Sequence, residues 1–414
     1  MTKEKVIPQI RFSGFTDTWE QHKLGDHSEI VAGGTPNTGH PEYWNPKEIP
    51  WMSSGEINNK VIYSTDNMIS KIGFSNSSAK WVKEKSVLIA LAGQGKTRGT
   101  VAISEIPLTT NQSIAAIQPD SFLYYKFLFQ NLEERYNELR EVSSGDGTRG
   151  GLNKQIISDL EVLAPEIQEQ IKIGDFLCGI DTLITLHQRK YDKLTKVKKA
   201  MLEKMFPENG SPYPEIRFKG FTDAWEQRKL GEISESFEYG LNAAATEYDG
   251  KHKYIRITDI DDSTHLFLQD DLTSPDIDFS TADDYLLQEG DVLFARTGAS
   301  VGKTYIYRRS DGDLYFAGFL IRAKIKSDYD ADFVFQNTLT DSYDSYIRIT
   351  SQRSGQPGVN AQEYANFALS VPSLAEQKKI GAYFSHLDSL ITLHQRKLEK
   401  LKNIKKACLE KMFV

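Results

Sequence analysis

The sequence is poor in several features that define large classes of protein. It has only two cysteines in 414 residues, Cys178 and Cys408, a usage typical of reduced thiols in a cytoplasmic protein. Its longest apolar runs, such as residues 87–92, are far shorter than the roughly 18 residues that a membrane-spanning helix needs. No apolar segment follows residues 1–5. These absences predict a cytoplasmic protein that does not engage a membrane.

The chain also lacks an excess of positive charge. Its 50 basic and 57 acidic residues give a net charge of −7, which argues against an indiscriminate binder of polyanions. Residues 207–360 alone carry 16 basic and 27 acidic groups, a net −11, whereas residues 361–414 carry 9 and 5, a net +4. A nucleic-acid reader with this balance would need local basic stripes rather than a general positive field.

No complete catalytic or metal-binding motif is present. Gly298–Gly302 fits the G-x-S-x-G pattern around Ser300, but residues 303–307 predict a strand where a nucleophile elbow needs a helix. The strings 95–97 and 302–304 read Gly-Lys-Thr, yet neither has the spacing and the following helix of a phosphate-binding loop. The eight histidines form no zinc-ligand pattern. We therefore expect no catalytic residues, no metal site and no cofactor bound by this chain.

What the sequence does contain is a large internal duplication. Residues 10–25 recur at 216–231 with 13 of 16 identical, and residues 180–206 recur at 387–413 with 19 of 27 identical. Between these anchors the halves diverge, so that little more than strings such as 151–153 and 358–360 agree. A period of about 207 residues is too long for a solenoid repeat. Similar ends around different middles favour two modules that do the same task on different targets; a duplication that drifted without consequence is the alternative.

The residue pattern of each half predicts a mixed α/β module. Runs rich in β-branched and aromatic residues, broken every 8–12 residues by Gly, Pro, Asn or Asp, indicate strands. The clearest strand candidates are residues 86–91 in the first half and 291–295 in the second. A helix is predicted over residues 121–142 and again over 332–349.

A long helix closes each half. After Pro165 and again after Pro372, apolar residues are spaced alternately by three and four positions over about 40 residues, which is the heptad pattern of a coiled coil. A narrow apolar seam that occurs twice in one chain predicts that the two helices pair with each other, antiparallel and around a pseudo-twofold axis. His187 and His394 occupy seam positions near the helix midpoints and either meet there or point to solvent. The lysines at 196–199 and 402–406 are predicted to lie on solvated faces.

Two glycine-rich polar loops recur at matching places in each half. One follows the first buried strand, at residues 93–99 and 296–304, and the other follows the internal helix, at 143–154 and 348–360. Glycine lets the backbone approach a phosphate chain, and Arg, Gln and Asn can contact base edges in the major groove. Tight solvated turns would have the same composition. The residues that we predict to contact DNA are Gln94, Lys96, Thr97, Arg98, Ser144, Arg149, Asn153, Lys154, Arg296, Thr297, Ser300, Lys303, Thr304, Arg353, Gln356 and Asn360.

These strings resemble the specificity subunit of type I restriction–modification systems over the whole chain. The resemblance rests on the opening Ile10–Gly25, on Gly33–Pro36 with Trp44 and Ile49–Trp51, on Asn111–Ala116, and on the closing Leu183–Lys190 with its twin at 390–397. The Gly33–Pro36 string has no clean twin in the second half, where Tyr239-Gly-Leu-Asn242 stands.

The resemblance implies two target recognition domains, 1–160 and 209–367, joined by spacer helices at 161–208 and 368–414. Each domain would read one half of a bipartite DNA target in the major groove, and the helices would fix the unread spacer between the halves. It also implies a non-catalytic chain that docks two methyltransferase subunits and two restriction subunits. S-adenosylmethionine, ATP and magnesium would be bound by those partners.

Two other classes of function compete with this interpretation. A scaffold that binds proteins through two divergent modules would have no affinity for duplex DNA, even with its partners present. A hydrolase using Ser300 would lose its activity on replacement of that serine.

Overall fold

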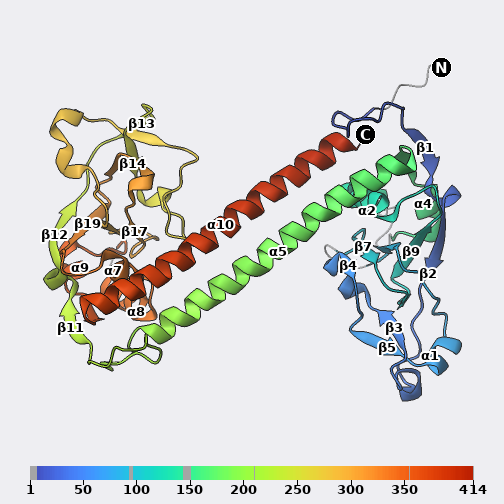
Figure 1. Cartoon of the computed structure of the whole chain (residues 1–414), viewed down its shortest axis with the longest axis horizontal. Coiled ribbons are helices and arrows are strands. Elements are labelled where there is room, and N and C mark those ends of the chain that lie inside the picture. The colour runs from blue at the N-terminus through green and yellow to red at the C-terminus, as the bar shows by residue number, and fades with distance from the viewer. Residues whose placement is uncertain (1–6, 93–96, 143–150, 209, 354, 414) are drawn as a thin grey trace. The chain divides into compact units, whose positions relative to one another are not determined.

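The computed structural model describes residues 7–92, 97–142, 151–208, 210–353 and 355–413 (Figure 1). The chain divides into two compact units: unit 1 comprises residues 1–186 and 397–414, and unit 2 comprises residues 187–396. Two helices have 39 residues each, α5 (Ile167–Met205) and α10 (Leu374–Met412). Each helix is divided between the units, with one segment in unit 1 and the other in unit 2. The predicted ranges 161–208 and 368–414 contain these helices but begin with short strands.

Unit 1 is a mixed α/β module built on a five-stranded sheet of order β2-β9-β6-β7-β4, with a three-stranded sheet of order β5-β3-β8 and the pair β1-β10. Its strands are β1 Glu20–Lys23, β2 Ser28–Ala32, β3 Ile49–Met52, β4 Val61–Ile62, β5 Asn67–Ile69, β6 Ser86–Ala90, β7 Val101–Ser104, β8 Thr109–Thr110, β9 Ile114–Pro119 and β10 Glu161–Ala164. Its helices besides α5 and α10 are α1 Lys71–Ser75, α2 Tyr125–Glu134, α3 Tyr136–Val142 and α4 Lys154–Asp159, with 3-10 turns at Leu24–Asp26, Pro41–Tyr43 and Ser54–Asn59.

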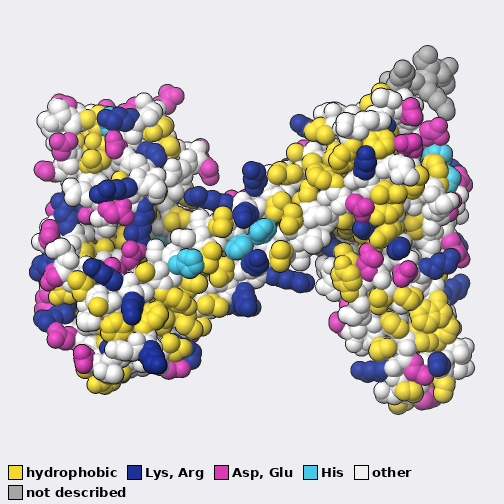
Figure 2. Space-filling model, viewed as in Figure 1, with side chains coloured by type: hydrophobic (Ala, Val, Ile, Leu, Met, Phe, Trp, Pro, Cys, Tyr) yellow, Lys and Arg dark blue, Asp and Glu magenta, His cyan; other side chains and the backbone are white. Residues whose placement is uncertain are grey.

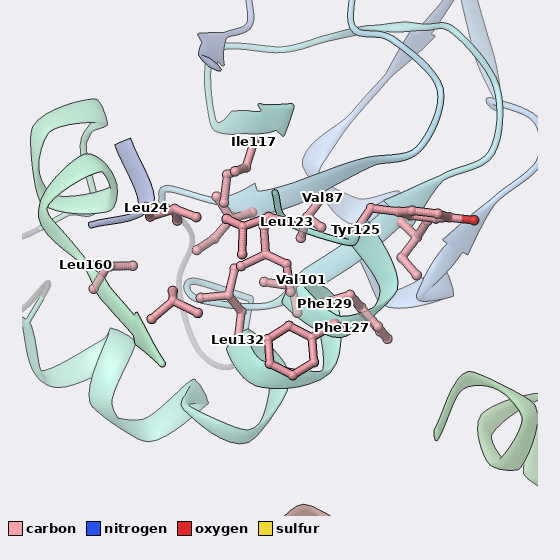
Figure 3. Packing of buried hydrophobic residues seen from close by; sticks show 14 of the residues in the cluster. Leu24, Val87, Val101, Ile117, Leu123, Tyr125, Phe127, Phe129, Leu132 and Leu160 are labelled. Carbon is pink, nitrogen blue, oxygen red and sulfur yellow. The ribbon is translucent and has the colours of Figure 1, made fainter. Parts of the chain in front are cut away.

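The core of unit 1 lies between the five-stranded sheet and α2 (Figure 3). Val87 from β6 and Ile117 from β9 pack with Phe127 and Leu132 of α2, and each of these four side chains is fully buried. Alternate residues of β6 enter a second cluster on the other face of the sheet. Strands buried on both faces explain why residues 86–90 read as one continuous apolar run.

Unit 2 repeats this plan with a four-stranded sheet of order β12-β19-β16-β17 and the pairs β11-β20, β13-β15 and β14-β18. Its strands are β11 Glu226–Lys229, β12 Ser234–Tyr239, β13 Ala245–Glu247, β14 Lys253–Ile255, β15 Thr273–Pro275, β16 Val292–Ala295, β17 Thr304–Ile306, β18 Leu314–Phe316, β19 Leu320–Ile325 and β20 Ala368–Val371. Its helices are α6 Leu230–Ile233, α7 Ala331–Asn337, α8 Asp341–Thr350 and α9 Ala361–Ala365, with 3-10 turns at Ile257–Asp259, Phe279–Thr281, Asp283–Tyr285 and Arg309–Asp311.

The internal helix predicted in each half is interrupted. In unit 1 it divides into α2 and α3, and in unit 2 into α7 and α8. In unit 2 the Thr340 hydroxyl accepts a hydrogen bond from the Tyr343 N–H and so starts a new helix. A local capping interaction therefore divides a segment whose apolar pattern is continuous.

The pairing of the long helices is antiparallel. In unit 2, His187 of α5 meets His394 of α10 with 2.8 Å between the Nδ1 atoms, and further along α5 Lys198 forms an ion pair with Asp388, 2.6 Å. The partner number falls as the α5 number rises, which defines an antiparallel pair. The two histidines meet at the seam, so the first of the two alternatives for them is confirmed.

The prediction that all the seam lysines lie in solvent was wrong for two of them. In unit 1 the Lys405 ammonium contacts the Asp181 carboxylate at 2.7 Å and Glu133, and its side chain is only 9% exposed. In unit 2 the equivalent residues, Lys198 and Asp388, form the same pair. Each lysine reaches across the seam because a neighbouring aspartate on the opposite helix compensates its charge.

The repeated lead segments anchor each unit to its long helices. Arg11 donates two hydrogen bonds of 2.7 Å to the buried Glu169 of α5, and Arg217 donates two, of 2.7 and 2.8 Å, to the buried Glu376 of α10. This hydrogen bonding raises the pKa of both guanidinium groups. The lead sequence therefore recurs because it forms the same buried ion pair in both units.

Both cysteines are free, as predicted. Burial raises the pKa of the Cys178 thiol to about 11, which keeps it protonated at neutral pH. No helix in the described part of the chain is both long and apolar enough to cross a membrane. Within the same residues, no three His, Cys, Asp or Glu side chains are grouped so that they could hold a metal ion.

We expect Arg217→Ala to destabilise unit 2 by about 3–5 kcal/mol, because it leaves the Glu376 carboxylate buried without a partner. Chemical denaturation of the full chain measures this loss. The matched control Lys219→Ala removes an exposed cation two residues away and should change the stability by less than about 0.5 kcal/mol. Equal effects of the two substitutions would contradict the proposed anchor.

Candidate nucleic-acid interface

The two glycine-rich loops of unit 2 lie against each other. The first, Arg296–Lys303, joins β16 to β17 as a hairpin in which the Gly302 N–H donates to the Ala295 carbonyl, 2.9 Å. The second approaches it through two backbone hydrogen bonds, from the Gly298 N–H to the Pro357 carbonyl at 3.1 Å and from the Val359 N–H to the Arg296 carbonyl at 2.9 Å. Loops that lie apart in the sequence therefore form one surface.

Unit 1 uses the same junction. The Leu152 N–H donates to the Leu91 carbonyl at 3.0 Å, which matches the bond between Val359 and Arg296. A Cβ added to Gly151 or to Gly358 would lie 3.4 Å from the carbonyl oxygen of Leu91 or of Arg296, respectively. The similarity between residues 151–153 and 358–360 thus has a structural cause, because both strings hold the second loop against the first.

The asparagines of these strings begin short helices. The Asn153 side-chain oxygen accepts from the Ile156 N–H, and that of Asn360 accepts from the Glu363 N–H, both at 2.9 Å. Both residues are exposed. Each can offer its amide NH₂ to DNA while its oxygen caps α4 or α9.

A groove with a volume of about 710 Å³ lies beside the first loop of unit 2. The Arg296 guanidinium stacks 5.0 Å from the centre of the Tyr239 ring, whose hydroxyl in turn accepts from the Ala361 N–H, 3.2 Å. Phe319, also on the groove wall, is 62% exposed. A cation fixed over an aromatic ring beside an exposed phenyl ring is suited to stacking on bases and to donating to their edges.

A second arginine faces this groove in a fixed orientation. Arg256 donates through Nε and Nη2 to the two carboxylate oxygens of Asp259, at 2.8 and 2.9 Å. This hydrogen bonding raises the pKa of Arg256, which keeps the guanidinium cationic. Its Nη1 group remains directed away from the carboxylate and available to a ligand.

Four predicted contact residues of unit 2 lie at the loop junction: Arg296, Thr297, Ser300 and Gln356. The backbone of Thr297 forms a bridge to Gly358, and Gln356 is exposed. Ser300 lies in the turn between strands β16 and β17. A turn between two strands is not the strand–turn–helix setting of a nucleophile elbow, which removes the motif basis for a hydrolase.

One predicted contact, Thr304, was wrong because its side chain is buried, and a second, Lys303, already has partners within unit 2. Thr304 is fully buried, and its hydroxyl hydrogen-bonds to that of Thr338 at 2.8 Å. The Lys303 ammonium donates to the Ile260 carbonyl at 2.9 Å and pairs with Asp262, with 11% of its side chain exposed. Burial beside the hairpin decides their direction, which composition does not reveal.

Arg353 is exposed but already has partners within unit 2. Its guanidinium donates to the Thr350 carbonyl at 2.8 Å and pairs with Glu363. In unit 1, Gln94, Lys96, Ser144 and Arg149 lie outside the described residues, whereas Thr97 and Arg98 are half-buried and Lys154 is exposed. Contact of these residues with DNA stays a prediction.

Several residues of the groove were not predicted from the sequence. Tyr239 and Asn242 belong to the string without a clean twin, and Arg256 and Phe319 lie on segments for which the sequence predicted no contact. The Gly33–Pro36 string does have a counterpart at 239–242 in backbone structure. The Gly34 N–H donates to the Thr110 carbonyl and the Leu241 N–H to the Phe316 carbonyl, both at 2.8 Å. An alignment of Gly33 with Gly240 would have revealed this match.

The arrangement as a whole defines a class of protein. Two modules share one backbone plan, each has a core that packs against segments of the two antiparallel helices, and they differ in the side chains that they expose. On the face in view, Lys and Arg side chains are interspersed with Asp and Glu over both units (Figure 2). These are the features of a duplicated recognition protein.

Comparison with known proteins names the family. Residues 16–196 and 222–403 each match the type I restriction modification DNA specificity domain, so the chain belongs to that family and contains the domain twice. It is 29% identical to the type I restriction enzyme MjaIX specificity subunit of Methanocaldococcus jannaschii, over 68% of this chain and 67% of that protein. It is 20% identical to the MjaVIII specificity subunit of the same organism, over 98% and 94% of the two chains.

A solved structure has the same fold. The S subunit of a type I restriction–modification system from M. genitalium superposes with a TM-score of 0.63 at 15% identity, over 99% of both chains. The mixed α/β architecture with two long helices, expected from the sequence, is confirmed.

We expect Thr304→Val to leave DNA recognition unchanged and to lower the free energy of unfolding by about 0.5–1.5 kcal/mol, because the hydroxyl has a buried partner and no route to a ligand. Thermal denaturation and DNA binding of the assembled complex measure the two effects. A shift in the recognised sequence with normal stability would reinstate Thr304 as a contact.

Proposed function

We propose that this chain is the DNA sequence-recognition subunit of a type I restriction–modification complex, in which each unit reads one half of a bipartite target. The observation that carries the proposal is the combination of a repeated backbone junction with unlike side chains at its matched positions. The Leu91–Leu152 and Arg296–Val359 hydrogen bonds are equivalent, yet one loop presents a leucine where the other presents an arginine. Two domains that recognise different base sequences need the same backbone arrangement with different side chains at the contact positions.

The role that we propose is non-catalytic. The chain contributes recognition, while two methyltransferase subunits and two restriction subunits perform the chemistry. S-adenosylmethionine, ATP and magnesium would be bound by those subunits, and assembly on DNA would take place in the cytoplasm. The family to which the chain belongs supports this division of labour.

The long helices would set the length of the unread spacer. Each spans 39 residues, hence about 58 Å at 1.5 Å per residue, and each contributes to both units. The seam of paired residues, such as His187 with His394, fixes the register of one helix against the other. A fixed register supports a constant separation between the half-sites.

Methylome sequencing of a host with and without this chain tests the proposal directly. A bipartite methylated motif that depends on the chain is the expected result. A complex that assembles with its partners but binds no duplex would instead favour a protein scaffold.

We predict that seven residues, one heptad, inserted into both α5 and α10 at the boundary of the units will lengthen the spacer by about three base pairs. The insertion adds about 10.5 Å of helix, against 3.4 Å per base pair. The methylated motif of the variant complex reports the spacer. The control Lys199→Ala changes an exposed helix residue without changing length and should leave the motif intact. Altered half-sites with an unchanged spacer would refute the ruler role.

We also expect weak DNA binding by the isolated chain. Residues 207–360 carry a net charge of −11, which opposes a polyanion. Addition of the methyltransferase subunits should raise the affinity at least tenfold at 150 mM salt, as measured by fluorescence anisotropy. Equally tight binding by the isolated chain would contradict a clamp supplied by its partners.

A further inference from the structure

The strand crossing that forms the floor of the unit 2 groove recurs in unit 1. In unit 1 the Gly33 N–H donates to the Ile114 carbonyl, 3.2 Å, and in unit 2 the Gly240 N–H donates to the Leu320 carbonyl, 3.2 Å. A Cβ on Gly33 would lie 2.1 Å from the Asn111 carbonyl oxygen, and one on Gly240 would lie 2.3 Å from that of Ala317. Both positions therefore require glycine, because the next segment of backbone occupies the space of a side chain.

In each unit an aromatic side chain donates a hydrogen bond to the backbone at this crossing. The Trp51 indole N–H donates to the Gly34 carbonyl and the Tyr254 hydroxyl to the Leu241 carbonyl, each at 3.0 Å. These rings occupy equivalent places in a parallel strand pair, since Trp51 aligns with Thr109 in β8 and Tyr254 with Tyr315 in β18. Different residue types thus fill one structural role.

The loops that continue from this crossing also correspond. The Asn111 N–H donates to Met52 and the Ala317 N–H to Ile255, both at 3.0 Å. Two residues further along, the Ser113 carbonyl accepts from the Leu91 N–H at 2.8 Å. In unit 2 the Phe319 carbonyl accepts from the Arg296 N–H at 3.0 Å. These hydrogen bonds align position 113 with 319 and position 91 with 296.

The turn after the parallel strand supplies one further match. The Ser53 N–H donates to the Glu56 carboxylate, 2.8 Å, and the Arg256 N–H donates to the Asp259 carboxylate, 2.9 Å. Both carboxylates lie three residues after the donor and cap a 3-10 turn. Position 53 therefore corresponds to position 256.

The matched positions carry unlike side chains. Written as unit 1 with unit 2, they are Thr35 with Asn242, Ser53 with Arg256, Leu91 with Arg296, Gln112 with Gly318, and Ser113 with Phe319. In unit 2 the hydrogen bonds described above fix the backbone of Arg256, Arg296 and Phe319. The Gly318 N–H donates to the Leu241 carbonyl at 2.6 Å, which fixes the fourth position. The backbone is constant here, and the chemistry offered to a ligand changes.

In unit 2 this chemistry suits guanine. Asp259 holds the Arg256 guanidinium by two hydrogen bonds. The Arg296 guanidinium lies 5.0 Å from the centre of the Tyr239 ring and donates through Nη1 to the Gly318 carbonyl at 3.4 Å. A guanidinium held in a fixed plane presents two parallel N–H donors, which match the O6 and N7 acceptors of guanine in the major groove. In the major groove adenine offers one acceptor beside a donor, thymine offers a single acceptor and cytosine offers a donor, so only guanine presents such a pair.

In unit 1 the chemistry suits adenine. Gln112 is exposed, and its side-chain oxygen accepts from the Thr35 hydroxyl, which fixes the orientation of the amide. An oriented carboxamide donates to N7 and accepts from N6 of adenine. No arginine occupies the matched positions of this unit.

We propose that these matched positions are the base-reading sites of the two units: Arg256 and Arg296 read guanine in the half-site of unit 2, and Gln112 reads adenine in the half-site of unit 1. This inference rests on the proposed function and assigns its specificity to particular residues. In unit 2 the groove, and in unit 1 the matched positions beside the same strand crossing, then carry the sequence discrimination, rather than the tips of the glycine-rich loops alone.

The test uses the complete chain assembled with its methyltransferase subunits. Arg256→Gln, Arg296→Gln and Gln112→Ala are compared by methylome sequencing and by binding to duplexes in which each base pair of the target is replaced in turn. Each arginine variant should lose roughly 5- to 150-fold discrimination at one guanine of a single half-site. Gln112→Ala should relax one adenine of the other half-site and leave the first unchanged. Arg309→Gln, an exposed arginine outside the groove lining, is the matched control and should alter neither.

The outcomes separate the two proposals. If the wild-type complex produces no bipartite motif, the proposed function itself fails. If it produces one, but the arginine variants keep full discrimination or weaken all sequences equally with a smaller salt dependence, the residues contact phosphate or nothing and the reading sites are refuted. Circular dichroism and normal co-purification with the partner subunits confirm that each variant is folded. An arginine variant that fails this check is replaced by lysine at the same position, Arg256→Lys or Arg296→Lys, which keeps the charge, removes the planar pair of donors, and should lose the same discrimination. A Gln112→Ala variant that fails it is replaced by Gln112→Met, which keeps the side-chain length without the amide and should relax the same adenine.

Discussion

The structure depends on buried charges that are compensated by partners far away in the sequence. Arg11 with Glu169, and Arg217 with Glu376, attach the lead of each unit to a long helix through paired hydrogen bonds. Lys405 with Asp181, and Lys198 with Asp388, join the two helices across their seam. A buried charge without its partner is costly, so only one register of lead and helix satisfies each set. The recognition modules are built on this constrained base.

The same constraint explains which parts of the duplication remained similar. The lead and the helices recur almost unchanged because both members of each ion pair, and the apolar seam beside them, must change together. Between the lead and the long helix, the two units have in common mainly their backbone hydrogen bonds. Gly33 and Gly240 are needed where backbones cross, whereas Trp51 and Tyr254 show that one hydrogen bond can be made by different rings. Divergence therefore concentrates in exposed side chains, which is where a recognition protein acquires a new target.

Acidic composition and DNA recognition are compatible in this arrangement. The arginines of the unit 2 groove are individually fixed, one by Asp259 and one by Tyr239, so they act by geometry more than by a long-range field. Fixed donors give discrimination between bases, while general affinity comes from phosphate contacts. A subunit that reads sequence can leave most of the phosphate contacts to its partners.

The sequence by itself determined the duplication, the two long helices with their seam and the strands of the cores, because these follow from local periodicity and from identity between the halves. It also indicated the loops that meet beside the groove. Only the tertiary structure decided that Thr304 is buried and that Lys303 pairs with Asp262. It also decided that Lys405 and Lys198 pair across the seam, and that Arg256 and Phe319 line the groove. The direction of a side chain and the partner of a charge are set by segments distant in the chain, and composition at a single position holds no record of them.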